Sequence, residues 1–210
     1  MSARALQRVA IRMHHDPYLV AAVYDDPDAA LADEELTADE RAMLIAPDQR
    51  AWGTDPARVD RVLEALRREL PVSCAIVELA SGSRRALLRF FSDEAFHDCV
   101  SNRGVLVFAF ADWLQDQGRE GRWGRIRLTA VATLEGACAR VRRGLPGDGL
   151  TVELPDGTIE LFAALSAALP TGRVPGLNRL PRLRSEPSEY LRVERKEGPG
   201  AELSVYAVEP

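Results

Sequence analysis

The sequence predicts an α+β protein in which a helical N-terminal body precedes a small antiparallel β-rich C-terminal part. Up to about Gly144 nearly every segment has apolar residues at helical spacing, whereas after Pro146 apolar and polar residues alternate. With 210 residues, of which 46% are hydrophobic and 28% charged, the chain can bury a core without disulfides or a metal. We therefore predict a helical domain over residues 1–145 and a β-rich domain over 146–210.

Local start signals mark the helices of the N-terminal body. Asp16 before Pro17 supplies a capping carboxylate and a proline at the first helical position. Thr37 followed by Glu40 is a capping-box pattern. Residues 72–79 are β-like in composition and are left unassigned. Further helices are expected from Asp55-Pro56 to Pro71, as three short helices within 85–117, and after Trp123 with Gly144 as C-cap.

Two hairpins are predicted in the C-terminal part. The first joins residues 150–154 to 158–162 through Pro155-Asp156-Gly157, although 161–169 equally suits the start of a helix. The second joins 189–195 to 201–208 around a Gly-Pro-Gly turn. The proline-rich stretch 170–187 is predicted to be the linker between them. A sheet of about four strands is too small to hide its edges, and an open edge can accept a peptide strand.

The sequence contains none of the common catalytic, nucleotide-binding or metal-binding motifs. Its three cysteines form no CxxC pair, which argues against a disulfide framework and a zinc site. His97 and Cys99 lie two residues apart on a predicted helix, so their side chains diverge by about 200°. We therefore expect no catalytic residues, no metal and no cofactor. An enzyme that uses Cys99 or Cys138 with His97 remains a weaker alternative.

Charge is distributed unevenly along the chain, whose formal net charge is -5. Residues 16–60 contain twelve acids and three arginines, whereas 118–143 contains seven arginines and two acids. The two segments can be solvated faces that attract each other within the monomer. Alternatively, the arginine-rich segment is a basic surface for an acidic peptide or partner protein. A helical DNA-binding or regulatory protein that uses residues 118–143 is the second functional hypothesis, although the negative net charge disfavours it.

Aromatic side chains concentrate in one window of the predicted helical body. Phe90 and Phe91 are adjacent, so on a helix they cannot both face the same core centre. One of them is therefore expected to border an exposed patch that a partner covers. The residues predicted for this partner interface are Phe90, Phe91, Phe96 and Trp113.

Three runs of sequence resemble a known family. They are DPYLVAAVYDDPDAALADEELTADERAMLIAPDQRAWGTDPARVDRVLEALRRELPVS at 16–73, LRFFSDEAFHDCV at 88–100 and GVLVFAFADWL at 104–114. Their order and spacing resemble the partner proteins of multinuclear non-haem iron-dependent oxidases, which modify ribosomally synthesised peptides in methanobactin and 3-thiaglutamate biosynthesis. The first run is also similar to the small helical subunit of some ring-opening dioxygenases and to certain peptide leaders. A β-rich tail after a helical body is similar to that family as well.

The resemblance implies a non-catalytic accessory subunit that forms a heterodimer with the oxidase. In that family a TIM-barrel subunit carries the iron ligands, while the partner docks the oxidase and captures the precursor's leader by strand addition. No short signature allows residue roles to be transferred. We expect no membrane partner and a cytoplasmic location, because the N-terminus lacks a signal-peptide pattern and no segment reaches the ~20 apolar residues of a membrane span. The residues predicted to bind the leader are Tyr190, Leu191, Arg192, Val193, Glu194, Leu203 and Val205.

Overall fold

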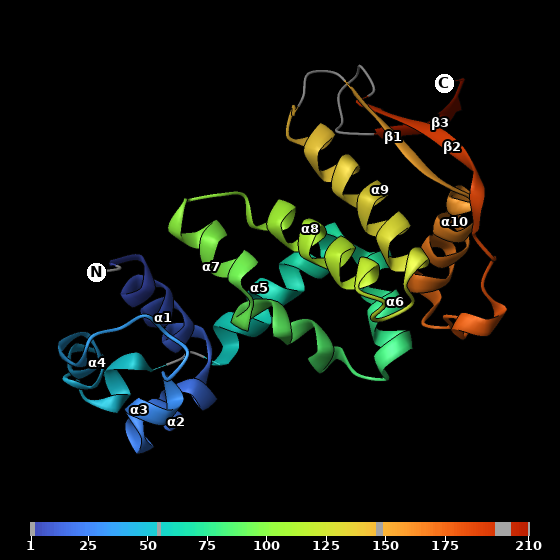
Figure 1. Cartoon of the computed structure of the whole chain (residues 1–210). Coiled ribbons are helices and arrows are strands. Elements are labelled where there is room, and N and C mark those ends of the chain that lie inside the picture. The colour runs from blue at the N-terminus through green and yellow to red at the C-terminus, as the bar shows by residue number, and fades with distance from the viewer. Residues whose placement is uncertain (1–2, 54–55, 146–148, 196–202, 210) are drawn as a thin grey trace. The chain divides into compact units, whose positions relative to one another are not determined.

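Helices come first along the chain and a small antiparallel sheet follows, as the computed structural model shows for residues 3–53, 56–145, 149–195 and 203–209 (Figure 1). The predicted α+β class is therefore confirmed. The chain forms two compact units: unit 1 comprises Met1–Glu64 with Leu88–Leu106, and unit 2 comprises Ala65–Leu87 with Val107–Pro210. These two units differ from the two domains predicted from the sequence, 1–145 and 146–210. Whether those two segments fold independently stays a prediction.

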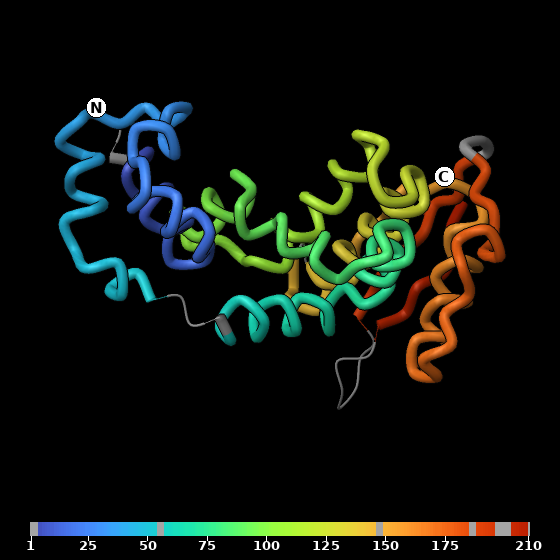
Figure 2. Tube along the Cα trace, turned by 90° about the horizontal axis from the view of Figure 1, so that it is seen from below, coloured from blue at the N-terminus to red at the C-terminus, as the bar shows by residue number. Residues whose placement is uncertain are grey.

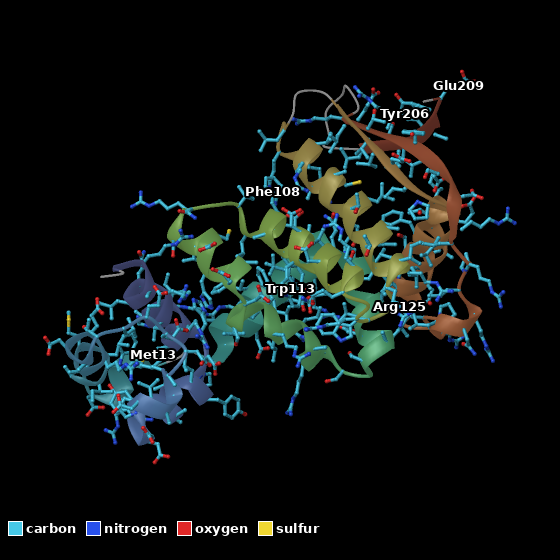
Figure 3. The ribbon with its side chains drawn as sticks, viewed as in Figure 1. Met13, Phe108, Trp113, Arg125, Tyr206 and Glu209 are labelled. Atoms are coloured by element: carbon cyan, nitrogen blue, oxygen red, sulfur yellow. The ribbon has the colours of Figure 1, made fainter. Side chains whose placement is uncertain are left out.

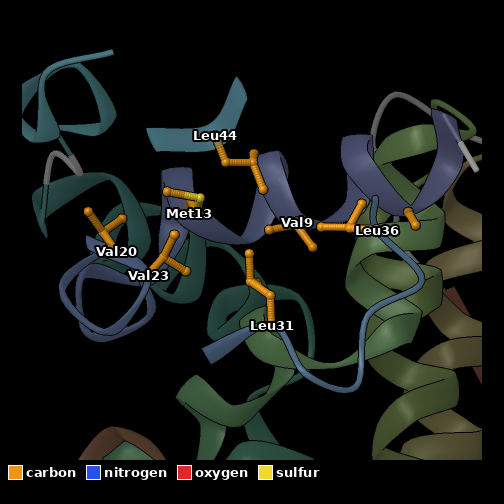
Figure 4. Close-up of a cluster of buried hydrophobic side chains, with 8 residues drawn as sticks. Val9, Met13, Val20, Val23, Leu31, Leu36 and Leu44 are labelled. Carbon is orange, nitrogen blue, oxygen red and sulfur yellow. The ribbon is translucent and has the colours of Figure 1, made fainter. Parts of the chain in front are cut away.

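Unit 1 is a small helical body built around an apolar core. Its first helix has Ala5, Val9 and Met13 on one face at a spacing of four residues, and all three are buried. They pack with apolar side chains from the helices that follow, as Figure 4 shows. The elements of unit 1 are α1 (Ala3–His15), α2 (Pro17–Asp25), α3 (Pro27–Ala30), α4 (Ala38–Ile45), the 3-10 helix η1 (Gln49–Trp52) and α7 (Glu94–Ser101).

The predicted helix starts in unit 1 are confirmed by their caps. The Asp16 carboxylate accepts hydrogen bonds from the N–H groups of Tyr18 and Leu19, at 2.9 and 3.1 Å. Thr37 and Glu40 form a reciprocal capping box: the Thr37 N–H donates to the Glu40 carboxylate at 2.8 Å, and the Glu40 N–H donates to Thr37 Oγ1 at 3.2 Å. Among the described elements, three helices have residues in both units: α5 (Pro56–Glu69), the 3-10 helix η2 (Arg84–Ser92) and α8 (Leu106–Arg119), of which only Leu106 belongs to unit 1.

Unit 2 contains the longest helix, α9 (Ile126–Arg142), which has buried residues along most of its length. Residues 72–79, which the sequence left unassigned, lie in α6 (Pro71–Ser81). The start of α6 is held by Glu135 of α9, whose two carboxylate oxygens accept the N–H groups of Val72 and Ser73 at 2.9 and 2.8 Å. Besides α8 from Val107 onward, the other helices of unit 2 are α10 (Thr158–Ala168) and the short 3-10 helices η3 (Leu169–Thr171) and η4 (Leu177–Arg179).

The sheet of unit 2 has three antiparallel strands in the order β1 (Gly149–Asp156), β2 (Arg184–Arg195), β3 (Leu203–Val208). Figures 1 and 2 show α9 and α10 beside the strands. One face of the sheet packs on α9, where a buried cluster joins helix and strands. The strand residues buried in this cluster are Leu154, Leu191 and Val193.

The first predicted hairpin is wrong, because Thr158 begins α10 rather than a strand. Gly157 turns the chain with φ 89°, which favours glycine. The Glu189 carboxylate of β2 then accepts the N–H groups of Thr158 and Ile159 at 2.9 and 3.3 Å, so it caps the new helix. The sheet described has three strands instead of four for this reason.

The antiparallel pairing of β2 with β3 confirms the second hairpin. Its predicted turn falls within 196–202, outside the described residues. The predicted linker 170–187 contains two short 3-10 helices and the start of β2. Among the described residues, no helix combines the length and apolar character needed to cross a bilayer.

Candidate functional site

The C-terminal sheet has two unlike faces, and the residues predicted to bind a peptide divide between them. Leu191 and Val193 of β2 are fully buried against α9. Tyr190, Arg192 and Glu194 alternate with them and therefore lie on the opposite face, where they are half-buried. The sheet thus has an apolar face under helices and a polar face.

A polar network runs across all three strands on this second face. The Arg192 guanidinium pairs with Glu194 at 2.9 Å between Nε and Oε1, and its Nη1 donates to Thr151 Oγ1 on β1 at 3.3 Å. The Tyr206 hydroxyl of β3 lies close enough to the Glu194 carboxylate for the two groups to shift each other's pKa. Gly149 leaves the necessary room, since a Cβ there would lie 2.8–2.9 Å from side-chain atoms of Glu194 and Arg192.

The charges in this network stabilise one another. The hydrogen bond from Arg192, followed by that from Tyr206, lowers the pKa of Glu194 below its ordinary value. The same carboxylate raises the pKa of Tyr206 by accepting its hydroxyl proton in a hydrogen bond. Glu194 is therefore ionised and Tyr206 is protonated at neutral pH.

The order of the strands in the sheet determines which of the predicted residues lie on a strand that can pair with an added peptide. β2 lies between β1 and β3, so its backbone is already paired on both sides and the prediction of an edge at Tyr190–Glu194 is wrong. β3 lies at the end of the sheet and pairs with β2 alone among the described strands. Leu203 and Val205 of β3 remain partly exposed while they pack against the core cluster. Sequence alternation identified these strands but could not show their order.

The aromatic residues predicted to contact a partner are instead internal. Phe90, Phe91 and Phe96 are buried in unit 1, with edge-to-face ring contacts at centroid distances of 5.2–5.7 Å. Trp113 is buried in unit 2, where it stacks on Phe110 at 5.7 Å. The prediction of an exposed patch is wrong, because the rings of Phe90 and Phe91 are both buried although the two residues are adjacent on a 3-10 helix.

Most arginines in the second half of the basic segment have acidic partners within unit 2. Arg140 forms an ion pair with Asp112, in which Nη2 contacts both carboxylate oxygens at 2.8 and 2.9 Å. Arg142 and Arg143 both pair with Glu69, and the hydrogen bonds from Arg143 are the main cause of the lowered pKa of Glu69. These ion pairs favour an intramolecular role for this half of the segment over a DNA-binding one. The first half, around Arg125, is different.

His97 and the cysteines do not form a nucleophile–base pair. His97 is 1% exposed in α7, and neither of its ring nitrogens has a hydrogen-bond partner among the described residues, the Cys99 thiol included. Desolvation, followed by the charges of Arg12, His15 and Arg8, lowers the pKa of His97 to about 4. A weaker effect of the Ser92 backbone acts in the opposite direction, but it falls short of a hydrogen bond.

The thiols of Cys99 and Cys138 are also poor nucleophiles. Burial raises the pKa of Cys99, and it raises that of Cys138 to about 11, so both are protonated at neutral pH. Across the residues that the structure describes, no group of three or more His, Cys, Asp or Glu side chains is arranged to hold a metal ion.

No protein-family model matches this sequence, and neither a curated protein nor a solved structure matches it.

Proposed function

We propose that this chain is a cytoplasmic, non-catalytic accessory subunit. It binds the leader of a ribosomally synthesised precursor peptide and docks a multinuclear non-haem iron-dependent oxidase that modifies the peptide. The sequence resemblance supports the class of partner enzyme. The layout of the C-terminal sheet supports the mode of peptide binding.

The observation that carries the proposal is the position of β3 at the end of the sheet. An end strand presents unpaired N–H and C=O groups along one side, and an extended peptide can pair with them. Leu203 and Val205 are only partly buried by the core cluster. A leader strand with apolar residues at alternate positions would extend this core, while its other residues would lie beside Ser204 and Tyr206 on the polar face.

The residues of β2 have a supporting role in this proposal. Leu191 and Val193 anchor the sheet to α9, and Arg192 with Glu194 holds Tyr206 through the polar network. Direct leader contacts come from β3, which retains Leu203 and Val205 from the predicted set. The oxidase docks on the helical part of the chain, which the buried aromatic residues support from within.

Adjacent proline substitutions in β3 test strand addition. Successive N–H groups in a strand point to opposite sides, so Ser204→Pro and Val205→Pro remove donors from opposite sides of β3. One of the two variants should keep the wild-type thermal midpoint yet lose leader binding, measured by fluorescence anisotropy with the labelled precursor peptide. The other should lower the midpoint, because it removes a bond to β2. If the folded variant binds the leader as wild type does, β3 is not the binding edge.

A pull-down with a multinuclear non-haem iron-dependent oxidase from the same genome tests the second part of the proposal. The wild-type chain should retain the oxidase at micromolar concentration, and the folded β3 variant should still do so. Loss of peptide binding with retained oxidase separates the two activities. Absence of oxidase binding by the wild-type chain would contradict the accessory role.

A further inference from the structure

The corner between α8 and α9 forms a hollow of about 440 Å³ on unit 2. Its lining includes Arg119 and Gly121 from the end of α8 and the following turn, and Arg125, Ile126 and Thr129 from the start of α9. Figure 3 marks Arg125 at this corner. None of these residues belongs to the C-terminal sheet, so the hollow is separate from the proposed leader site.

Arg125 has a backbone conformation that L-residues rarely adopt, with φ 50° and ψ -121°. The N–H of Arg127 donates to the carbonyl of Gly124 at 3.2 Å. These values match the first central position of a type II′ turn, which glycine normally occupies. A side chain there costs about 1–2 kcal/mol. An arginine at such a position suggests that its guanidinium has a use that offsets this cost.

The corner is held in place by the core of unit 2. Trp123, which also has a positive φ, lies 5.6 Å from Trp113 between ring centroids. Gly124 lies so close to the core that a Cβ there would be 3.0 Å from Ile76 Cγ2. The Arg125 side chain extends beside Gly121, where a Cβ would lie 3.7 Å from its Nε. The Arg125 guanidinium therefore extends from a turn that packs against the core of unit 2, and it lies next to the hollow.

The charge of the corner is opposite to that of the chain. Residues 116–127 contain four arginines and two acids, a balance of +2, whereas the whole chain has -5. Arg119 and Arg122 have side chains that are 62% and 51% exposed although each has an acidic neighbour, Asp116 and Glu120. Among the described residues Arg125 has no ion pair. Ile126 adds an exposed apolar side chain.

We infer that this corner docks an acidic segment of a partner protein, in which carboxylates face Arg119 and Arg125 and an apolar residue contacts Ile126. Charge complementarity selects the occupant, because guanidinium groups bind carboxylates with directed hydrogen bonds. Nucleic acid fits less well, since a phosphate backbone needs more cations than this corner offers and the negative chain repels it. The inference goes beyond the proposed function and is independent of strand addition at β3.

Arg125→Gly is the most informative variant. Glycine adopts φ 50° without steric cost, so the fold should be at least as stable as wild type while the guanidinium is lost. The probe is a labelled peptide of repeating Glu-Glu-Leu triplets, and its binding to the full chain is followed by fluorescence anisotropy at low salt. We expect saturable binding by wild type, weakened about tenfold by Arg125→Gly and by Arg119→Glu. Raising the salt concentration should weaken wild-type binding as well.

Arg173→Glu is the matched control, because Arg173 is an exposed arginine of unit 2 outside the corner. This control should bind the probe nearly as wild type does. Equal weakening by all three variants, or no binding by wild type at low salt, would overturn the inference. Tighter binding of a labelled oligonucleotide that Arg125→Gly abolishes would assign the corner to nucleic acid instead. Ser204→Pro and Val205→Pro should not affect the probe if they remain folded, which separates this site from the leader site.

Discussion

Units 1 and 2 each bury an ionisable side chain, and they accommodate it in opposite ways. Glu135 in unit 2 is 3% exposed and accepts two backbone N–H groups at the start of α6. His97 in unit 1 is 1% exposed and has no hydrogen-bond partner among the described residues. A buried polar group is therefore retained in this protein either because donors surround it or because its environment keeps it neutral.

The two environments shift pKa values in opposite directions. Desolvation raises the pKa of Glu135 to about 7, although the hydrogen bonds from Ser73 and Val72 and the charge of Arg142 oppose it. Desolvation lowers the pKa of His97 to about 4. In both cases burial favours the neutral form, which is the protonated form of a carboxyl and the deprotonated form of an imidazole.

Phe96→Ala should destabilise unit 1 by about 3–5 kcal/mol, because it removes a buried ring and leaves a cavity. The Phe96 ring lies 5.0–5.5 Å from those of His15, Phe90 and Phe91. Urea unfolding measures the loss, and hydrogen exchange shows whether it is confined to unit 1. Water entering the cavity should also raise the pKa of His97 towards 6.5, as followed by NMR. Tyr18→Ala is the control, since Tyr18 is 86% exposed, and a loss below about 1 kcal/mol in Phe96→Ala would contradict the packing.

The pH dependence of stability should have opposite signs in the two units. The unfolded chain binds the His97 proton more tightly, so this residue's contribution is complete above pH 6.5 and is lost as the pH falls towards 4. The folded chain binds the Glu135 proton more tightly, so its contribution is complete below pH 4.5 and is lost as the pH rises through about 7. Each contribution is at most about 3 kcal/mol. Hydrogen exchange of α7 and α6 between pH 4 and 8 measures both, with His97→Gln and Glu135→Gln removing the respective slopes. Parallel slopes in the two helices would refute the contrast.

Glu135→Gln should lower the stability of unit 2 by about 2 kcal/mol at acidic pH, because one backbone N–H of α6 loses its acceptor. The Gln amide oxygen can accept from only one of Val72 and Ser73, while the NH₂ group faces the other. Urea unfolding at pH 5 measures the effect. The penalty should shrink as the pH rises from 4.5 to about 7, because only the wild-type chain loses the stability contribution of Glu135 over this range. A penalty that grows with pH would show that the carboxylate is charged in the folded protein at acidic pH.

Arg125 is an exposed residue with a strained backbone, unlike the buried residues Glu135 and His97, and its replacement should change stability least. Arg125→Gly should raise the free energy of unfolding of unit 2 by about 1 kcal/mol, because it relieves a positive φ. Thermal denaturation measures the change. Arg125→Ala keeps the strain and should bring no such gain, so equal midpoints for the two variants would show that the turn is unstrained.

The sequence predicts features that depend on neighbouring residues and misses those that depend on distant ones. The caps at Asp16 and Thr37 bind N–H groups within three residues, so their patterns are visible in the sequence. The helical starts of α6 and α10 are instead held by Glu135 and Glu189, from 62 and 31 residues away. No local pattern reveals such a donor–acceptor match.

The candidate site likewise depends on contacts between distant residues, which local sequence patterns do not reveal. Alternation identifies β2 and β3 as strands, and it assigns Leu191 and Val193 to one face. The position of β2 in the middle of the sheet depends on its pairing with β1, which follows from packing over α9. The aromatic cluster was misplaced for a related reason, because the sequence cannot show which segments cover Phe90 and Phe91.

The path of the chain through the two units has a consequence for how the protein can be divided. The backbone passes between the units three times, at 64/65, 87/88 and 106/107. Neither unit is therefore a continuous fragment, and no single truncation isolates one of them. Cleavage at any one of these points breaks the chain into two fragments, and at least one unit is then divided between them. Such a nicked protein is held together only by the packing inside the divided unit, because its cysteines are free.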